Sequence, residues 1–188
     1  YMLGQFNAFE TAQQIMRNKG ATAGDKQKAV MFYRAIRMRK QIVDFAVNKI
    51  HKFTEIYEQS KDKRILVFGG ANDFTDRLCD SIAPNAMSYH SKKTKKQKET
   101  ALQSFKDGTI NVLCSTKALN QGFDVPDANM GVICGITSKS LSMIQRVGRL
   151  IRFKEGKVGS IVILYVADSQ EEKWLKKAVK NLKNIIWK

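Results

Sequence analysis

The stretch Ile65-Leu66-Val67-Phe68-Gly69-Gly70 sets the fold class of this chain. Four consecutive apolar residues indicate a short strand buried on both faces, because a strand with one solvent-exposed face alternates apolar and polar side chains. The two glycines end the strand, and Asn72 or Asp73 is placed to cap a following helix. This stretch therefore predicts a strand-to-helix unit of an α/β protein.

The sequence after this unit repeats the alternation of strands and helices. Capping boxes at Thr94/Gln97 and Ser169/Glu172 predict the starts of two helices, and residues 141–147 predict another. Alternating strands and helices, with continuous apolar strands, favour one parallel sheet covered by helices on both faces. The further strands are predicted at 87–90, 110–113, 130–134 and 161–166.

Residues 1–60 show helical periodicity only. A short amphipathic helix is predicted from Phe6 to Ile15, and a longer one from Val30 to Tyr57. The arginines and lysines of the longer helix either meet nucleic acid or are simply solvated. We expect a helical arm or connector at 1–60, followed by one domain at 61–188.

The charge of the chain indicates a polyanionic partner. Its formal net charge of +16 favours nucleic acid over a small acidic metabolite, although a generally basic surface would give the same value. No apolar run approaches the ~20 residues needed to cross a bilayer, and no signal-peptide pattern is present. We therefore expect an intracellular protein, cytoplasmic or nucleoid-associated, with no membrane partner.

The cysteines and histidines do not form a metal-binding pattern. Cys79, Cys114 and Cys134 lie far apart in apolar surroundings, which favours buried thiols over disulfides or a zinc site. With two histidines in the chain, no metal site is predicted. The chain opens on Tyr1, so we expect a piece of a longer protein or a tag remnant.

Polar residues follow the predicted strands at 65–68 and 110–113. Functional groups gather at the carboxyl ends of parallel strands, so we expect Gly69, Gly70, Ser115 and Thr116 to share one edge with the later arginine segment. The two hydroxyls either donate to a phosphate together with backbone amides or merely cap a short helix.

Two further patterns suit phosphate or sugar recognition. Gly122 permits a turn that aims Asp124 at a sugar hydroxyl, unless Asp124 only precedes a proline turn. A lysine run, which includes Lys92, Lys93 and Lys98, opens the helix capped by Thr94. Each cation there opposes the helix dipole by ~0.3 to 1 kcal/mol, which favours a role in phosphate contact over a solvated run.

The segment Gln145-Arg146-Val147-Gly148-Arg149-Leu150-Ile151-Arg152 sets three guanidiniums around one glycine. Planar, always-charged donors suit the stabilisation of charge on a transferring phosphoryl group. Taken alone, the segment is also consistent with the basic end of an ordinary helix.

Three runs together resemble motifs IV, V and VI of superfamily 2 helicases and translocases. They are Arg64 to Leu78, Val112 to Pro126 and Gln145 to Arg152, in the order and spacing of that family. The resemblance covers about 61–166. It implies a RecA-like parallel sheet flanked by helices, which is the second of two RecA-like domains that close on ATP.

The resemblance also implies roles for individual residues. Arg149 and Arg152 would be arginine fingers for ATP held by an N-terminal RecA-like domain, with Gln145 orienting the same site. Arg146 would organise the cleft between the domains, and Asp124, with Gly122, would meet the nucleotide ribose. The nucleic-acid backbone would be bound by Thr116, Ser115, Gly69, Gly70, Lys92, Lys93 and Lys98.

No Gly-x-x-x-x-Gly-Lys-[Ser/Thr] loop and no Asp-Glu pair after a strand occur in these 188 residues. Mg-ATP is therefore expected to be held mainly by the partner domain, and this chain is not expected to hydrolyse ATP alone. The leading hypothesis is the C-terminal half of an ATP-dependent helicase or translocase, with DNA slightly favoured over RNA. The alternatives are a stand-alone nucleic-acid-binding or annealing module without ATPase, and the translocase part of a restriction or remodelling enzyme.

Overall fold

The computed structural model describes residues 3–116, 128–151 and 159–187, and the chain divides into two compact units, Tyr1–Val43 and Asp44–Lys188. The first unit consists of α1 (Leu3–Arg17) and most of α2 (Ala23–Asp44). The ring of Tyr33 lies edge-on to that of Phe9, with the ring centroids 5.6 Å apart. The predicted helical character of this part of the chain is confirmed.

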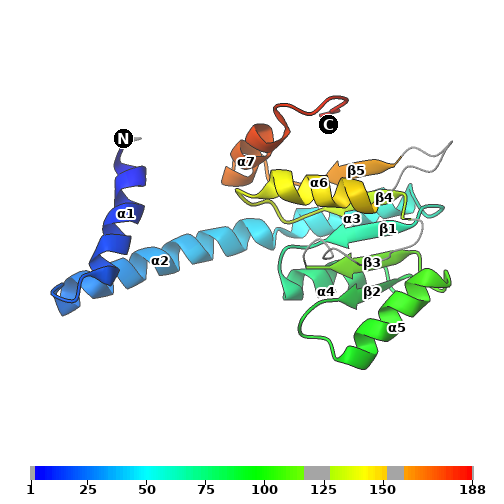
Figure 1. Ribbon diagram of the computed structural model, residues 1–188, viewed down its shortest axis with the longest axis horizontal. Coiled ribbons are helices and arrows are strands. Elements are labelled where there is room, and N and C mark those ends of the chain that lie inside the picture. The colour runs from blue at the N-terminus through cyan, green and yellow to red at the C-terminus, as the bar shows by residue number, and fades with distance from the viewer. Residues whose placement is uncertain (1–2, 117–127, 152–158, 188) are drawn as a thin grey trace. The chain divides into compact units, whose positions relative to one another are not determined.

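The second unit is built on a five-stranded sheet in the order β2-β3-β1-β4-β5, with every pair of neighbours parallel. The α/β parallel sheet predicted from the apolar runs is confirmed (Figure 1). The strands are β1 (Ile65–Phe68), β2 (Ala86–Tyr89), β3 (Val112–Ser115), β4 (Met130–Ile133) and β5 (Ser160–Ile163).

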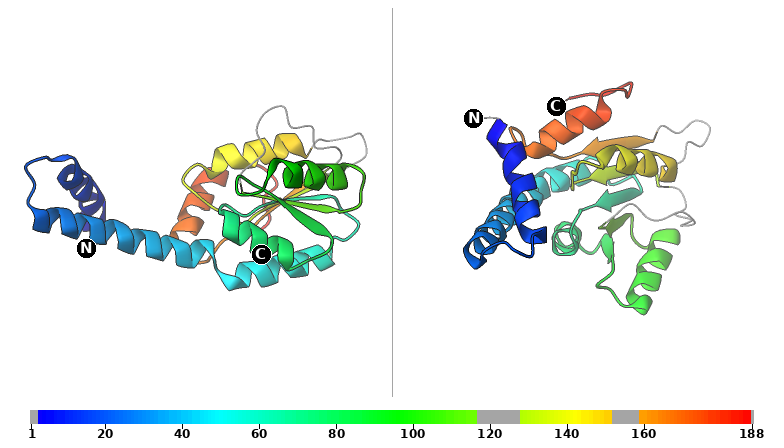
Figure 2. Two further views of the ribbon diagram at one scale, coloured as in Figure 1. Left: turned by 90° about the horizontal axis from the view of Figure 1, so that it is seen from below. Right: turned by 60° about the vertical axis from the view of Figure 1, so that its left-hand side comes forward.

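Helices cover both faces of this sheet (Figure 2). Successive residues of β1 point to opposite faces, so Ile65 and Val67 join one hydrophobic cluster while Leu66 and Phe68 join the other. One face is covered by α3 (Val47–Glu58) and α4 (Asn72–Asp80). The other face is covered by α5 (Lys95–Lys106), α6 (Ser140–Leu150) and α7 (Gln170–Val179).

The predicted long helix from 30 to 57 is instead two helices, and Phe45 and Ala46 separate them along the chain. Phe53 and Tyr57 of α3 are buried against β1 and α4, so α3 belongs to the sheet domain rather than to a helical arm. The boundary between the units therefore lies at residues 43 and 44, earlier than the predicted residue 60. No glycine or proline marks the break, since the chain has neither between 25 and 68.

A buried ion pair joins α3 to α7. The Nζ atom of Lys49 lies 2.7 Å from Oε2 of Glu171, and the two side chains are 3% and 2% exposed. Lys49 also donates to the Cys134 carbonyl at 2.9 Å, while Glu171 accepts from the backbone N–H of Val166 at 3.0 Å. Each charge thus has hydrogen bonds beyond the pair, which offsets part of the cost of removing it from water.

Of the helix caps predicted at residue 94 and at residue 72 or 73, the first is present in the structure and the second is not. The capping box of Thr94 and Gln97 is confirmed, with both reciprocal bonds present. The predicted cap at Asn72 or Asp73 is wrong, because Ala71 holds the cap position of α4 and no side chain caps it. Among the described residues, no helix is long and apolar enough to span a membrane.

Candidate functional site

The carboxyl ends of β1, β2 and β3 lie next to one another. Ser115, the last residue of β3, is aligned with Phe68 of β1 and with Tyr89 of β2. β3 ends two residues later than predicted, so Ser115 is buried inside the sheet and Thr116 is the first residue beyond it. Backbone bonds from Gly69 to Ser115 at 2.9 Å and from Gly70 to Thr116 at 3.1 Å confirm that these predicted residues meet.

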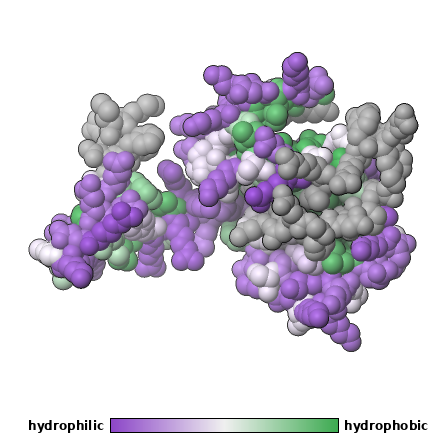
Figure 3. Space-filling view, viewed as in Figure 1, coloured by the Kyte–Doolittle hydropathy of each residue, from purple (hydrophilic) through white to green (hydrophobic). Residues whose placement is uncertain are grey.

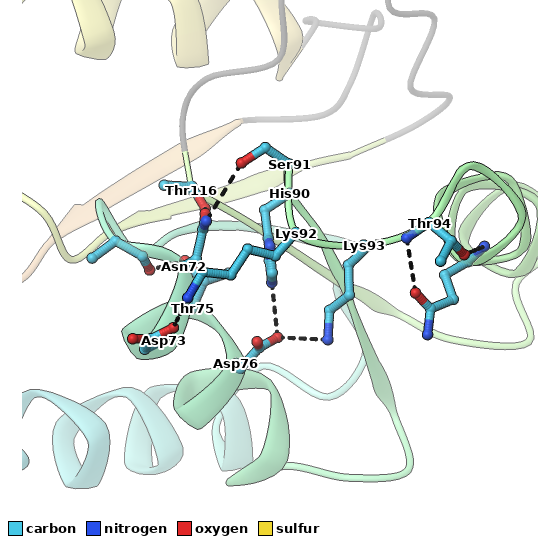
Figure 4. A network of polar contacts seen from close by, with 12 residues as sticks. Asn72, Asp73, Thr75, Asp76, His90, Ser91, Lys92, Lys93, Thr94 and Thr116 are labelled. Carbon is cyan, nitrogen blue, oxygen red and sulfur yellow. Dashed lines mark hydrogen bonds and ion pairs between the residues drawn. The ribbon is translucent and has the colours of Figure 1, made fainter.

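Asn72 links the loops that follow these three strands. The Thr116 hydroxyl donates to Asn72 Oδ1 at 2.6 Å, and Asn72 Nδ2 donates to the Ser91 hydroxyl at 3.4 Å (Figure 4). Sequence reasoning missed this role, because Thr116 lies 44 residues from Asn72 along the chain. The side chain of Asn72, which the sequence predicts as a helix cap, instead orients the hydroxyl of Thr116.

The two glycines after β1 are required by the packing of the protein itself. A Cβ on Gly69 would lie 2.4 Å from Thr75 Oγ1 and 3.0 Å from Thr75 Cα. Gly70 has a φ of +80°, and a Cβ on it would lie 3.0 Å from Cα of Gly135. The glycine pattern is thus explained by close backbone packing, and its predicted role in phosphate approach stays a prediction.

Two lysines of the basic run are paired with carboxylates on α4. Lys92 lies 2.7 Å from Asp73, and Lys93 lies 3.0 Å from Asp76. The buried ring of His90 also contacts Asp76, with Nε2 and Oδ1 3.0 Å apart (Figure 4). Lys92 and Lys93, both predicted to bind nucleic acid, therefore have intramolecular anionic partners.

The pKa of Asp76 reflects this crowded environment. Partial burial by itself raises the pKa, but hydrogen bonds to His90, Ser88 and Lys93 outweigh that effect and lower it to about 2. Asp76 is therefore ionised at neutral pH and anchors the loop between β2 and α5.

The rest of the lysine run remains open to solvent. Lys98 is partly exposed on α5, and no ion pair involves it within the described part of the chain. Hydrophilic residues dominate the visible surface over α5 (Figure 3). On the same helix, Lys95 lies 3.9 Å from Glu99, and both side chains are largely exposed. Among the described residues, no carboxylate of another element forms an ion pair with the lysines of α5.

Residues 145–150 of the arginine segment lie on α6, which runs back along the sheet. Ile144, Val147 and Ile151 are buried, while Gln145 and Arg146 are exposed. A Cβ on Gly131, near the start of β4, would lie 2.6 Å from Val147 and 2.7 Å from Ile151. These contacts place the end of α6 at the amino ends of the strands.

The prediction that the arginine segment shares the carboxyl edge with Thr116 is therefore wrong. A helix between two parallel strands has to run antiparallel to them to reach the start of the next strand, so its last turn lies at the opposite edge. Arg149 belongs to that last turn, and its side chain is outside the described part of the structure. The other predicted residues Arg152, Gly122 and Asp124 also lie outside the described residues.

Comparisons with known proteins show the family of this chain. The family model described as the helicase conserved C-terminal domain matches residues 48–154, which is more than half of the chain. The chain belongs to the helicase conserved C-terminal domain family. The match begins in α3, consistent with α3 packing against the sheet.

Individual relatives of this helicase domain fall into two groups. It is 31% identical over 116 residues to the DNA 3'-5' translocase XPB2 of Sulfurisphaera tokodaii, covering 60% of the chain and 26% of the relative. It is 33% identical over 115 residues to the pre-mRNA-splicing ATP-dependent RNA helicase PRP28 of Candida glabrata, covering 61% and 19%. The chain thus spans about a quarter or less of these relatives, and the expected preference for DNA over RNA finds no support.

Solved structures confirm the RecA-like fold of this helicase domain. Domain 2 of the DEAD-box helicase Mss116p, bound to an RNA duplex, matches with a TM-score of 0.60 at 22% identity, covering 77% of this chain and 59% of that one. The Sulfolobus solfataricus SWI2/SNF2 ATPase core, in complex with double-stranded DNA, matches with a TM-score of 0.61 at 16% identity, covering 90% and 39%. At these identities the likeness concerns the fold alone.

Proposed function

We propose that this helicase domain is the C-terminal half of an ATP-dependent nucleic-acid helicase or translocase. In this role, Arg149 and Arg152 stabilise the transferring phosphoryl group of ATP held by an N-terminal RecA-like domain, and Gln145 helps to orient that site. The carboxyl edge of the sheet contacts the nucleic-acid backbone. The observation that supports the proposal best is the family match over residues 48–154.

The residues of α6 that the structure describes fit a phosphate ligand. Gln145 and Arg146 are exposed donors on a helix whose opposite face is fixed against β4 by Val147. A helix backbone fixed in this way would limit the reorganisation needed to present these donors to developing negative charge. ATP would supply the transferable phosphoryl group, and its Mg²⁺ and main phosphate contacts would come from the other domain. This chain alone is expected to lack ATPase activity.

The carboxyl edge fits a polyanion with a regular backbone. Thr116 presents a hydroxyl whose hydrogen is held by Asn72, so a nucleic-acid phosphate would compete with Asn72 for it. Ser115, Gly69 and Gly70 hold the adjoining backbone, and Lys98 adds an unpaired cation within the described residues. Such contacts bind phosphates without reading bases, so binding independent of base sequence is expected.

Replacement of Arg149 by alanine in the full-length protein tests the ATP-directed role. Loss of an arginine finger is expected to lower kcat for nucleic-acid-stimulated ATP hydrolysis by about three to five decades. The measurement is a steady-state ATPase assay at saturating nucleic acid, with oligonucleotide affinity measured in parallel. Affinity in the absence of ATP should remain close to that of the unmodified protein, since the last turn of α6 and Thr116 lie at different edges.

A matched control is Arg77→Ala, which removes an exposed arginine from α4. That variant should retain normal ATPase activity. Near-normal ATPase activity of Arg149→Ala would contradict the finger assignment and would favour the binding module without ATPase.

A further inference from the structure

Lys92 and Lys93 are neighbours in sequence but their ion pairs differ in surroundings. The pair of Lys92 and Asp73 is open to water, with side chains 63% and 70% exposed. The pair of Lys93 and Asp76 is about half as exposed, at 29% and 32%, and shares its carboxylate with buried His90. Similar N–O distances of 2.7 and 3.0 Å therefore describe two different situations.

Lys93 is held in place from several directions. Oδ1 of Asp76 contacts both Lys93 and His90, and the His90 side chain is 1% exposed. The carboxylate of Asp76 also hydrogen-bonds with Ser88 of β2. If Lys93 moved to bind a ligand, Asp76 would lose its cationic partner. Lys93 therefore stabilises the loop between β2 and α5.

Within the part of the chain that the structure describes, Lys92 has a single, solvent-exposed partner. No other bond of Lys92 or Asp73 side chains is found among the described residues, and exposed ion pairs contribute little to stability. Asp73 stands in the first turn of α4, one residue after Asn72, which bonds to Thr116. The carboxylate therefore lies beside the proposed nucleic-acid-binding edge (Figure 4).

We propose that Asp73 is an internal competitor that occupies Lys92 in the free protein and weakens nucleic-acid binding. This inference rests on the proposed function, because Lys92 changes partner from Asp73 to a backbone phosphate when nucleic acid binds. Asp73 thereby lowers the affinity of the helicase domain for the nucleic-acid backbone. Lys93, fixed by Asp76 and His90, takes no part in the exchange.

The exchange has a specific electrostatic signature. In the unmodified protein, a phosphate that takes Lys92 leaves the Asp73 carboxylate unpaired beside a polyanion, and like charges at short range repel. Removing the carboxylate eliminates both the competition and the repulsion. The variant should bind more tightly, and its affinity should depend more steeply on salt, because one more lysine neutralises phosphate fully.

The test compares the chain with Asp73→Asn by fluorescence anisotropy on labelled 20-mer single strands of dT and of U, across a salt series. Asp73→Asn is expected to bind about two- to fivefold tighter near 0.1 M salt and to steepen the slope of log K against log salt by about 0.7. The double variant Asp73→Asn/Lys92→Gln should lose this gain, because no cation remains to be released.

Asp80→Asn is the matched control, since Asp80 is an exposed carboxylate at the far end of the same helix. It should change affinity less than Asp73→Asn does. Equal gains for the two variants, or a gain that persists without Lys92, would overturn the inference by reducing it to net charge. Unchanged affinity of Asp73→Asn would overturn it while leaving the proposed function intact. Absence of binding by every protein, the unmodified chain included, would overturn both.

Discussion

Lys49–Glu171 and Lys92–Asp73 are both lysine–carboxylate pairs with N–O distances of 2.7 Å, yet they occupy opposite environments. The first is almost fully buried and links α3, α7 and the backbone after β4 and β5. The second joins two exposed side chains near the proposed nucleic-acid-binding edge. The comparison indicates that burial and additional hydrogen bonds, rather than ion-pair distance, decide whether a pair supports the fold or remains available for exchange.

The two pairs differ in stability because, when a pair breaks, the remaining charge is either solvated by water or left buried. An exposed charge regains water, so the loss of its partner costs little. A buried charge cannot do so, and the remaining ion keeps its full desolvation cost. Lys93–Asp76, which is about a third exposed, lies between these limits. The three pairs therefore form a graded series within one domain.

The largest effect is expected for Lys49→Met. It removes one partner of the buried pair and leaves the Glu171 carboxylate uncompensated, so the free energy of unfolding should fall by about 3–5 kcal/mol. Urea-induced unfolding followed by circular dichroism measures this change. Lys92→Met, which removes a lysine from the exposed pair, should leave the unfolding midpoint unchanged.

The double variant Lys49→Met/Glu171→Gln separates charge from packing. Glutamine removes the stranded charge but keeps an oxygen that accepts from the Val166 N–H, which Glu171 bonds at 3.0 Å. Most of the stability lost by Lys49→Met should therefore return. If the double variant were less stable than Lys49→Met, the buried pair would owe its effect to packing, and the comparison would fail.

An intermediate effect is expected for Asp76→Ala. It leaves Nε2 of buried His90 without its carboxylate partner, and an unsatisfied buried polar group costs about 1–3 kcal/mol. The measurement is again urea unfolding at neutral pH. A cost as small as that of Lys92→Met would show that the half-buried pair behaves like an exposed one.

Asp76→Asn adds a test by pH. The folded-state pKa of Asp76 is about 2, below the ~3.9 of an unfolded aspartate, so its ionised form stabilises the fold. That contribution is complete above about pH 4 and is lost as the pH falls towards 2. The stability difference between the unmodified chain and Asp76→Asn should therefore shrink over this interval. A difference that stays constant would argue against the lowered pKa.

The sequence predicts the layers of this domain well, because each layer depends on local patterns. A continuous apolar run identifies β1, and the Thr94/Gln97 pair identifies the start of α5 within one residue. The break between α2 and α3 has no such signal. It depends on Phe53 and Tyr57 packing against a sheet that the local sequence does not contain.

The candidate site is predicted less completely for the same physical reason. The sequence predicts that the two glycines and the two hydroxyls lie close together, because each pair follows a predicted strand of the parallel sheet. The bond from Thr116 to Asn72 and the pair of Lys49 with Glu171 join residues 44 and 122 apart in sequence, where no local pattern operates. The motif order does not show at which edge the arginine segment lies, because this depends on the direction in which α6 runs along the sheet.

The smallest effect on the free energy of unfolding is expected for Asp73→Asn, which is expected to strengthen nucleic-acid binding. Asp73 lies in the first turn of α4, where a negative charge interacts favourably with the helix dipole by about 0.3–1 kcal/mol, so the variant should lose stability of that size. Lys92→Met should lose none, because the dipole contribution of Asp73 does not require its partner. Urea midpoints measured at low salt and again at 0.5 M salt separate the two variants. Equal losses for both would mean that the exposed pair stabilises the fold after all, and Lys92 would then not be free to exchange Asp73 for phosphate.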